Sequence, residues 1–252
     1  MNAPDSFCFN VMINIENISI SFGNLTLFRG LDLQVHYGES VCICGGSGSG
    51  KSSLLKAVLG FVPLSEGTIK VDGTLLAPKT ADHIRKKIAW IPQELALPSE
   101  WVSEMVRMPF ELKANREAGF SKERLMDYFV SLGLEEKLYD KRVNEVSGGQ
   151  RQRIGIARAL TVQPKLIIAD EPVSALDVTI PAQVLELLKQ LKEEMGLSIL
   201  FISHDLRVVY QMCNHVMIMQ KGQFVEMGVP EEIYFAPKDP YTKKLLESAG
   251  IE

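Results

Sequence analysis

Eight consecutive small or basic residues stand out as a stretch that could bind phosphate. They fit the pattern G-x-x-x-x-G-K-[ST] and run Gly45, Gly46, Ser47, Gly48, Ser49, Gly50, Lys51 and Ser52. Backbone N–H groups without bulky side chains can surround an anion, a lysine can reach the β- and γ-phosphates, and a serine hydroxyl can bind Mg²⁺. This stretch therefore predicts a site for a nucleoside triphosphate.

The segments on either side of these glycines support the same interpretation. Residues 41–44 predict a short apolar strand, and residues 53–59 are good helix formers that end at Gly60. The glycine-rich loop would then lead into a helix N-terminus, where the helix dipole favours an anion, and Ser53 would lie in that first turn. The alternative, a flexible Gly/Ser linker, would not be bracketed by a buried strand and an amphipathic helix.

Two acidic residues close a second apolar stretch. Residues 166–170 are hydrophobic up to Asp170, and continuous hydrophobicity predicts a strand buried on both faces, as in a parallel sheet. At its tip, Asp170 could hold Mg²⁺ through the water shell of the ion, and Glu171 could activate an attacking water. A pair of solvated acids at a strand end is the alternative.

Two further polar residues follow predicted strands. His204 comes just after the apolar residues 198–202, and Gln93 follows the short strand 87–91 and Pro92. In α/β proteins, ligand contacts come from the carboxyl ends of parallel strands. We therefore expect Gln93 and His204 to face the same edge as the glycine-rich loop, where the histidine could hydrogen-bond a phosphate oxygen or the attacking water. A lone histidine is otherwise most often structural.

A second glycine-rich helix start lies in the middle of the chain. Ser147 is a predicted N-cap, with Gln150 three residues later, and Gly148 and Gly149 leave N–H groups open to an anion. The segment is a second candidate phosphate site, although the same residues could form only a cap.

The remaining segments predict the scaffold. Alternating hydrophobic residues over 12–38 and a strand at 67–72 predict an antiparallel sheet beside the loop. Phe22 in that sheet could stack on a nucleotide base or belong to the core. Helical spacing over 99–110 and 121–132 predicts a helical insertion at residues 94–146, with Trp101, Met105 and Met108 on one apolar stripe. That stripe either packs inside the insertion or forms a docking face.

Size and charge limit the class of protein. The chain has 252 residues, 46% of them hydrophobic, and a net charge of −4, which fits one α/β domain without a general attraction to nucleic acid or anionic lipid. No apolar run reaches the roughly 18 residues that span a bilayer, and the first ten residues do not resemble a secretory signal, so we expect a cytoplasmic protein. Cys42 and Cys44 are expected to be buried on one strand face rather than to bind metal.

Taken in order, these segments resemble the ATP-binding cassette (ABC) ATPase, the nucleotide-binding subunit of ABC transporters, over about residues 12–248. The likeness is carried by an aromatic residue before the loop (Phe22), Walker A (Gly45–Ser52), the Q-loop (Gln93), the signature (Val146–Gln150), Walker B (Leu166–Asp170) with Glu171, the D-loop (Ser174–Asp177) and the switch His204. The family usually has Leu in place of Val146 and Tyr or Trp in place of Phe22.

The resemblance implies one nucleotide-binding domain over residues 1–252. Its fold would be an α/β P-loop NTPase with a mixed-sheet core, an antiparallel β subdomain and a helical signature subdomain. ATP and Mg²⁺ would be its cofactors, with Mg²⁺ held by Ser52, Gln93 and Asp170, while Glu171, His204 and Gln93 would serve catalysis.

The resemblance also implies partners. Two such domains close head to tail, so Ser147, Gly148, Gly149 and Gln150 would act on the ATP of a second ABC ATPase subunit. Asp177 would be the functional residue of the D-loop. An integral membrane permease and a substrate-binding protein complete the expected assembly on the inner face of the cell membrane, and no nucleic acid is expected.

Two parts of the chain resemble different transport systems. Residues 177–184 and 237–246 look like the ATPases that drive peptide and nickel importers, whereas residues 90–94 look more like compact cassettes that include metal exporters. We expect an importer of peptides or of a nickel-type metal cargo, with the ATPase of a metal exporter or a non-transport P-loop NTPase as alternatives. A P-loop kinase or GTPase fits less well, because the guanine-reading Asn-Lys-x-Asp is missing and a glutamate after Asp170 favours water as the acceptor.

Overall fold

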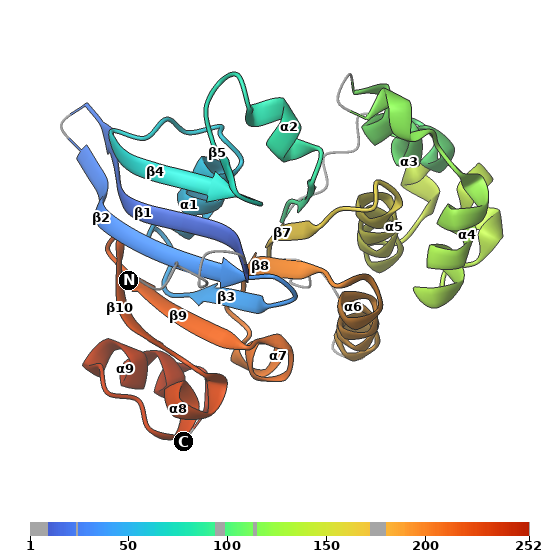
Figure 1. The fold of residues 1–252 in the computed structure, drawn as a ribbon. Helices are drawn as coiled ribbons and strands as arrows, with labels where there is room; N and C mark the ends of the chain where they lie inside the picture. The colour runs from blue at the N-terminus through green and yellow to red at the C-terminus, as the bar shows by residue number, and fades with distance from the viewer. Residues whose placement is uncertain (1–9, 24, 94–98, 113–114, 172–179, 252) are drawn as a thin grey trace, which may run out of the picture.

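The computed structural model describes residues 10–23, 25–93, 99–112, 115–171 and 180–251. Within them, the central sheet has six strands in the order β10-β9-β3-β8-β7-β6 (Figure 1). All neighbours are parallel except β10, which runs antiparallel to β9. The strands are β3 (Ser40–Cys44), β6 (Ile88–Ile91), β7 (Leu166–Asp170), β8 (Ser198–Ile202), β9 (His215–Gln220) and β10 (Gln223–Gly228).

Both faces of this sheet are covered, as the continuous hydrophobicity of its strands predicted. All five residues of β3, of β7 and of β8 are buried. Alternate side chains of β3 enter different cores, with Cys42 and Cys44 on one face and Val41 and Ile43 on the other. The two cysteine sulfur atoms lie 3.6 Å apart in the interior, which confirms that they share a buried face.

The predicted antiparallel sheet is present beside the core. Its strands follow the order β2-β1-β4-β5, with β1 (Val11–Phe22), β2 (Leu25–His36), β4 (Glu66–Val71) and β5 (Thr74–Leu75). Isoleucines of β1 share one hydrophobic cluster with the buried face of α1 (Lys51–Val58) and with one face of the central sheet. The helix that follows the glycine-rich loop is thereby fixed in the core.

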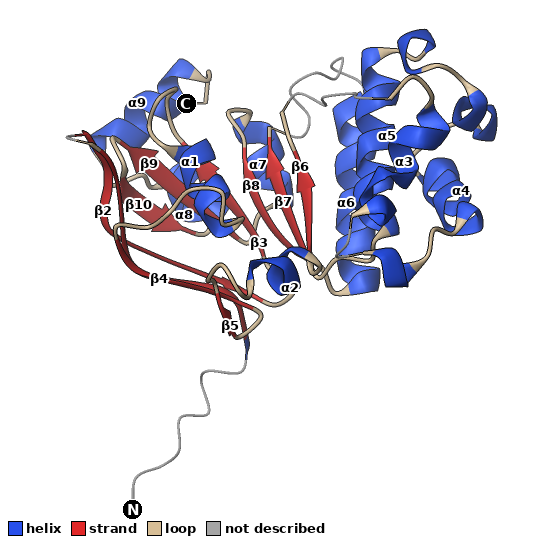
Figure 2. Cartoon of the chain, turned by 90° about the horizontal axis from the view of Figure 1, so that it is seen from above, coloured by secondary structure: helices blue, strands red, loops and turns tan. Residues whose placement is uncertain are grey.

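Helices cover the other face of the central sheet. Figure 2 shows α3 to α6 grouped together on one side of the molecule. They are α3 (Val102–Glu111), α4 (Lys122–Ser131), α5 (Gly148–Thr161) and α6 (Ile180–Met195), with 3-10 turns at Arg116–Ala118, Glu136–Asp140 and Val143–Glu145. Because α5 packs against α3 and α4, the helical layer continues past residue 146. The boundary of the insertion at 94–146 stays a prediction.

The start of α3 differs from the expectation. The helix was predicted from Ser99 but begins at Val102, because Trp101 is extended and forms a bridge with Arg142. The Arg142 guanidinium carbon also lies 5.2 Å from the centre of the Trp101 ring. Met105 is only 1% exposed, whereas Met108 is half-buried. Trp101, Met105 and Met108 therefore do not form one docking face. For Met105, which is buried, the prediction of a docking role is wrong.

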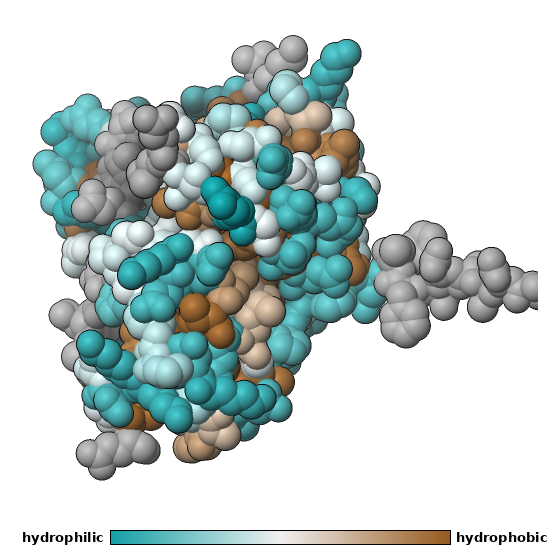
Figure 3. All heavy atoms as spheres, turned by 90° about the vertical axis from the view of Figure 1, so that its left-hand side faces the viewer, coloured by the Kyte–Doolittle hydropathy of each residue, from teal (hydrophilic) through white to brown (hydrophobic). Residues whose placement is uncertain are grey.

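The last third of the chain wraps the end of the central sheet. It contains α7 (Leu206–Met212), the β9–β10 hairpin, α8 (Pro230–Phe235) and α9 (Pro240–Ser248), while the short α2 (Ala81–Arg85) lies earlier, before β6. On the side seen in Figure 3, polar side chains predominate and hydrophobic ones form small separate groups. Among the described residues, every helix is too short or too polar to cross a membrane.

Candidate nucleotide site

The predicted site residues gather at the carboxyl edge of four neighbouring parallel strands. β3 leads into the glycine-rich loop, β8 into His204, β7 into Glu171 and β6 into Gln93. Since these strands are adjacent and parallel, their carboxyl ends share one edge of the sheet. Together they line one pocket, formed by Leu27, Gly45, Ser47, Gly48, Gly50, Lys51, Ser52, Ser53, Gln93, Asp170, Glu171, Ile202 and His204.

Two glycines are required by the shape of the loop. Gly45 has φ 150° and Gly50 has φ 107°, which side chains rarely allow. A Cβ at Gly45 would lie 2.1 Å from the Met219 carbonyl oxygen, and one at Gly50 would lie 2.5 Å from the Phe28 ring. Only glycine fits at either position, so the loop can fold tightly over the start of α1.

The Lys51 side chain folds back onto the glycine-rich loop that precedes it. Its Nζ donates to the carbonyl oxygens of Gly45 and Gly46, at 2.8 and 2.9 Å. Burial lowers the pKa of Lys51, although the carboxylates of Glu171 and Asp170 are among the groups that oppose this shift. A half-buried cation beside the uncapped N-terminus of α1 suits a polyphosphate, because both carry positive potential.

Asp170 and Ser52 meet in the same pocket. Asp170 is 9% exposed, and burial raises the pKa of its carboxyl even though a hydrogen bond with the Ser52 side chain lowers it. A hydroxyl and a carboxylate in contact form an oxygen-rich pair, which suits a hard divalent cation.

Glu171 is held between the two other candidate catalytic residues. Gln93 Nε2 donates to its Oε2 at 2.9 Å, and His204 Nδ1 lies 3.1 Å from its Oε1. The Glu171 backbone has φ 47°, and its N–H donates to the Ile202 carbonyl at 3.0 Å. The structure thus brings together three residues that are far apart in the sequence and aims one carboxylate at the phosphate pocket.

The signature residues lie away from this pocket within one chain. Ser147 caps α5 as the sequence predicted: its Oγ accepts from the Gln150 N–H at 3.2 Å, and its own N–H donates to the Gln150 side chain at 2.9 Å. Ser147 and Gly148 are exposed, and Gly149 is half-exposed. This helix start is therefore exposed to a ligand that another molecule carries.

Three residues predicted to bind the nucleotide do not line the pocket: Phe22, Gly46 and Ser49. Phe22 is 52% exposed at the end of β1, and Leu27 of β2 lines the pocket instead. Base stacking by Phe22 therefore stays a prediction, and Leu27 is a pocket residue that the sequence did not reveal. Asp177 lies outside the described residues.

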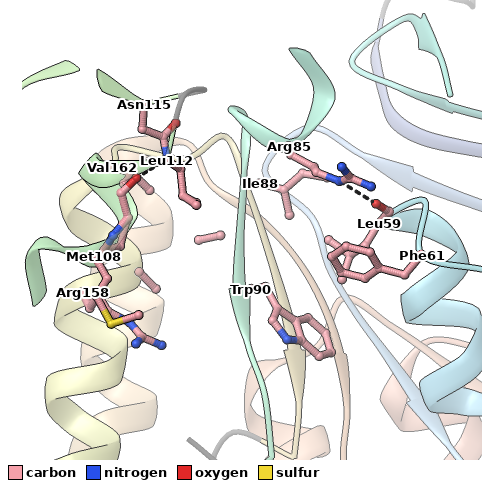
Figure 4. Close-up of a pocket in the computed structure, with 13 residues that line it drawn as sticks. Leu59, Phe61, Arg85, Ile88, Trp90, Met108, Leu112, Asn115, Arg158 and Val162 are labelled. Atoms are coloured by element: carbon pink, nitrogen blue, oxygen red, sulfur yellow. Dashed lines mark hydrogen bonds between the residues drawn. The ribbon is translucent and has the colours of Figure 1, made fainter. Parts of the chain in front are cut away.

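A second cavity of about 320 Å³ opens between the helical layer and the core (Figure 4). One wall carries Leu59, Phe61, Arg85, Ile88 and Trp90, and the other carries Met108, Leu112, Asn115, Arg158 and Val162. We refer to it as the helical-layer groove. Met108, from the predicted apolar stripe, is one of its lining residues.

Comparison with known proteins agrees with this geometry. The family model described as ABC transporter matches residues 28–174. The oligopeptide transport ATP-binding protein OppF of Haemophilus influenzae is 42% identical over 234 residues, covering 90% of this chain and 70% of that protein. The methionine import ATP-binding protein MetN of Carboxydothermus hydrogenoformans is 36% identical over 244 residues, covering 94% and 72%.

Solved structures show the same fold. The dimeric structure of the ATP-binding cassette MJ0796, in a post-hydrolysis state bound to ADP and Pi, matches with a TM-score of 0.78 and 28% identity, covering 87% of this chain and 99% of that one. The chain therefore belongs to the ABC transporter family, as one of its ATP-binding, ATP-hydrolysing subunits.

Proposed function

We propose that this subunit hydrolyses ATP with Glu171 as the general base and that it powers an importer of peptides. The observation that carries the chemistry is the position of the Glu171 carboxylate, held by Gln93 and His204 at the mouth of the phosphate pocket. A carboxylate there can orient a water and take its proton, while Lys51 and the loop N–H groups bind the phosphates.

We assign the bound cation as Mg²⁺. Ser52 would be a direct ligand, with Asp170 acting through water and Gln93 completing the oxygen set. The hydrogen bond between Ser52 and the buried Asp170 supports this assignment, because Mg²⁺ binds through few protein oxygens plus waters and phosphates. The ion would neutralise the β- and γ-phosphate oxygens.

We further assign Ser147 to Gln150 to the ATP of a second subunit. Their exposure on a capped helix N-terminus, outside the pocket of their own chain, supports a site completed by two subunits. Ser147→Arg, which puts a bulky cation at that surface, should abolish the ATP-dependent increase in mass seen by light scattering. An unchanged ATP-dependent dimer would contradict the composite site.

Import of peptides is supported by what the similar proteins are named for. OppF is named for oligopeptide transport and MetN for methionine import. The assay is ATPase activity with co-expressed permeases in vesicles, comparing a short peptide, methionine and Ni²⁺ as cargo. We expect stimulation by the peptide with an importer-type permease. Stimulation only with an exporter-type permease would overturn the direction of transport.

The helical-layer groove is the proposed contact with the permease. Its lining is mostly apolar, and Phe61 and Leu112 are 61% and 60% exposed. Arg158 points into it half-buried; burial lowers its pKa, and its guanidinium has no hydrogen-bond or ion-pair partner within the described chain (Figure 4). A desolvated cation in an apolar groove fits a permease helix with an apolar face and one acidic residue.

Leu112→Asp and Arg158→Glu test this contact. Each should reduce permease-dependent stimulation at least about tenfold. Arg158→Glu places a negative charge against the acidic residue of the permease, and Leu112→Asp places an unpaired acid against its apolar face. Basal ATP hydrolysis should persist. Val130→Asp, at an apolar residue of α4 that is 66% exposed, is the matched control. Full stimulation of both groove variants would exclude the groove as the permease contact.

A further inference from the structure

We propose that Tyr241 of α9 is a positioning residue for the phosphate loop, so that the C-terminal helix sets the affinity for nucleotide. The proposal rests on the ATP site described above and adds to it a residue far outside the segment, 28–174, that matches the family. Tyr241 does not line the nucleotide pocket and acts through the backbone of Gly46.

The contact is a direct hydrogen bond. The Gly46 N–H donates to the Tyr241 hydroxyl oxygen at 2.7 Å. The Gly46 carbonyl in turn accepts from Lys51 Nζ at 2.9 Å and from the Ser49 N–H at 3.3 Å. Tyr241 therefore fixes the N–H side of Gly46. The carbonyl of the same residue orients the phosphate-binding Lys51 and the next turn of the loop.

Tyr241 is itself held in place. Its own N–H donates to the Asp239 carboxylate at 2.7 Å, which caps α9. The Glu226 carboxylate on β10 accepts from the N–H groups of Lys238 and Asp239, at 2.8 and 3.1 Å. Leu246 anchors the far end of α9 in the core at 4% exposure. The hydroxyl is therefore delivered by a fixed helix rather than by a free side chain.

Two more contacts from the same third of the chain support the outer side of the loop. The Gly222 N–H, in the β9–β10 turn, donates to the Ser49 carbonyl at 2.9 Å. The Met219 carbonyl lies so close to Gly45 that a side chain there is excluded. The β9–β10 hairpin and α9 thus contact the glycine-rich loop, while other residues of the loop line the pocket.

Loss of the Tyr241 hydroxyl has a specific expected effect. The Gly46 N–H would lose its acceptor, and the loop would spend part of its time in geometries that bind phosphate poorly. ATP and ADP should both weaken, because the loop meets the β-phosphate that they share. The contacts that hold Glu171 to Gln93 and His204 involve neither Tyr241 nor Gly46, so the rate constant of hydrolysis should change little.

The first test compares Tyr241→Phe with Tyr128→Phe in the full chain. Tyr128 lies on α4, and its hydroxyl contacts the Met195 sulfur at 3.8 Å as its one hydrogen-bond partner among the described residues, so Tyr128→Phe is the matched loss of a phenol oxygen. We expect Tyr241→Phe to raise the Kd of ATP and ADP about 2- to 10-fold, with kcat within about twofold of wild type. If Tyr241→Phe lowers the Tm but leaves both Kd values unchanged, Tyr241 serves only the stability of the fold and the proposal is overturned.

The second test follows the Gly46 amide directly by hydrogen exchange. In the wild type it should be protected, and Tyr241→Phe should remove that protection while the Leu54 amide, bonded to the Gly50 carbonyl at 3.0 Å, stays protected. Fast exchange of Gly46 in the wild type would contradict the contact. Lys51→Ala separates the two claims. If the wild type binds ATP no better than Lys51→Ala, the proposed function fails. If ATP affinity depends on Lys51 but is unchanged in Tyr241→Phe, only this inference fails.

Discussion

Glu171 holds a left-handed backbone conformation at the tip of β7, which costs a non-glycine residue on the order of 1 kcal/mol. Its N–H bond to Ile202 and the two side-chain contacts to its carboxylate compensate for that strain. The result is a carboxylate whose position is fixed before any ligand arrives. Such pre-organisation is expected of a catalytic base.

His204 supplies one of those two contacts, so its removal should affect turnover more than binding. We expect His204→Ala to lower kcat about 10- to 100-fold and to change the Kd of ATP less than about threefold, because the phosphate loop is untouched. Steady-state hydrolysis and equilibrium ATP binding measure the two quantities. His83→Ala, at an exposed position on α2, is the control. Equal losses in kcat and affinity would contradict a catalytic position for His204.

At the scale of the element, α3 divides its methionines between two environments. Met105 is buried in the helical layer, and Met108 lines the groove. Met105→Ala should lower the free energy of unfolding by about 2–4 kcal/mol, because a buried side chain is replaced by a cavity. Met108→Ala should cost less than about 1 kcal/mol. Urea denaturation of both variants checks this, and similar losses would contradict the assignment of faces.

Periodicity predicted that α3 exists and that its stripe is apolar, but it could not separate Met105 from Met108. Both satisfy the same spacing, and only packing against α5 and the core decides which is covered. The start of α3 was missed for a similar reason, since the pairing of Trp101 with Arg142 is a long-range contact. By contrast, Gln93, Glu171 and His204 were predictable, because strand ends in a parallel sheet must share an edge. No local pattern could link Tyr241 to Gly46.

At the scale of the whole molecule, Asp72 ties the antiparallel sheet to the central one. Its carboxylate, 12% exposed, bonds Lys87 Nζ at 2.7 Å and Lys165 Nζ at 3.1 Å and accepts from the Tyr37 hydroxyl. Burial alone would raise the pKa of Asp72, but these hydrogen bonds outweigh it and lower the pKa to about 2. The unfolded value is near 3.8, so the ionised form is stabilised by folding.

This network predicts a pH-dependent stability. Its contribution is fully present above about pH 4 and is lost as the pH falls toward 2, where Asp72 becomes protonated in the folded state too. Asp72→Asn should be less stable than wild type by on the order of 1–2 kcal/mol at pH 6, and the difference should shrink between pH 4 and pH 2. Urea titrations across that range measure it, with Asp82→Asn, at an 82% exposed carboxylate, as the control. A difference that stays constant with pH would contradict the assignment.

The most direct measurement of the central claim is hydrolysis of bound ATP by Glu171→Gln in a single turnover. The amide preserves the shape of the side chain and cannot accept a proton, so we expect ATP to bind with a Kd within about threefold of wild type, and the hydrolysis rate to fall at least about 100-fold. Glu194→Gln, an exposed acid on α6, should behave as wild type. Hydrolysis by Glu171→Gln at the wild-type rate would show that another group activates the water and would contradict the account.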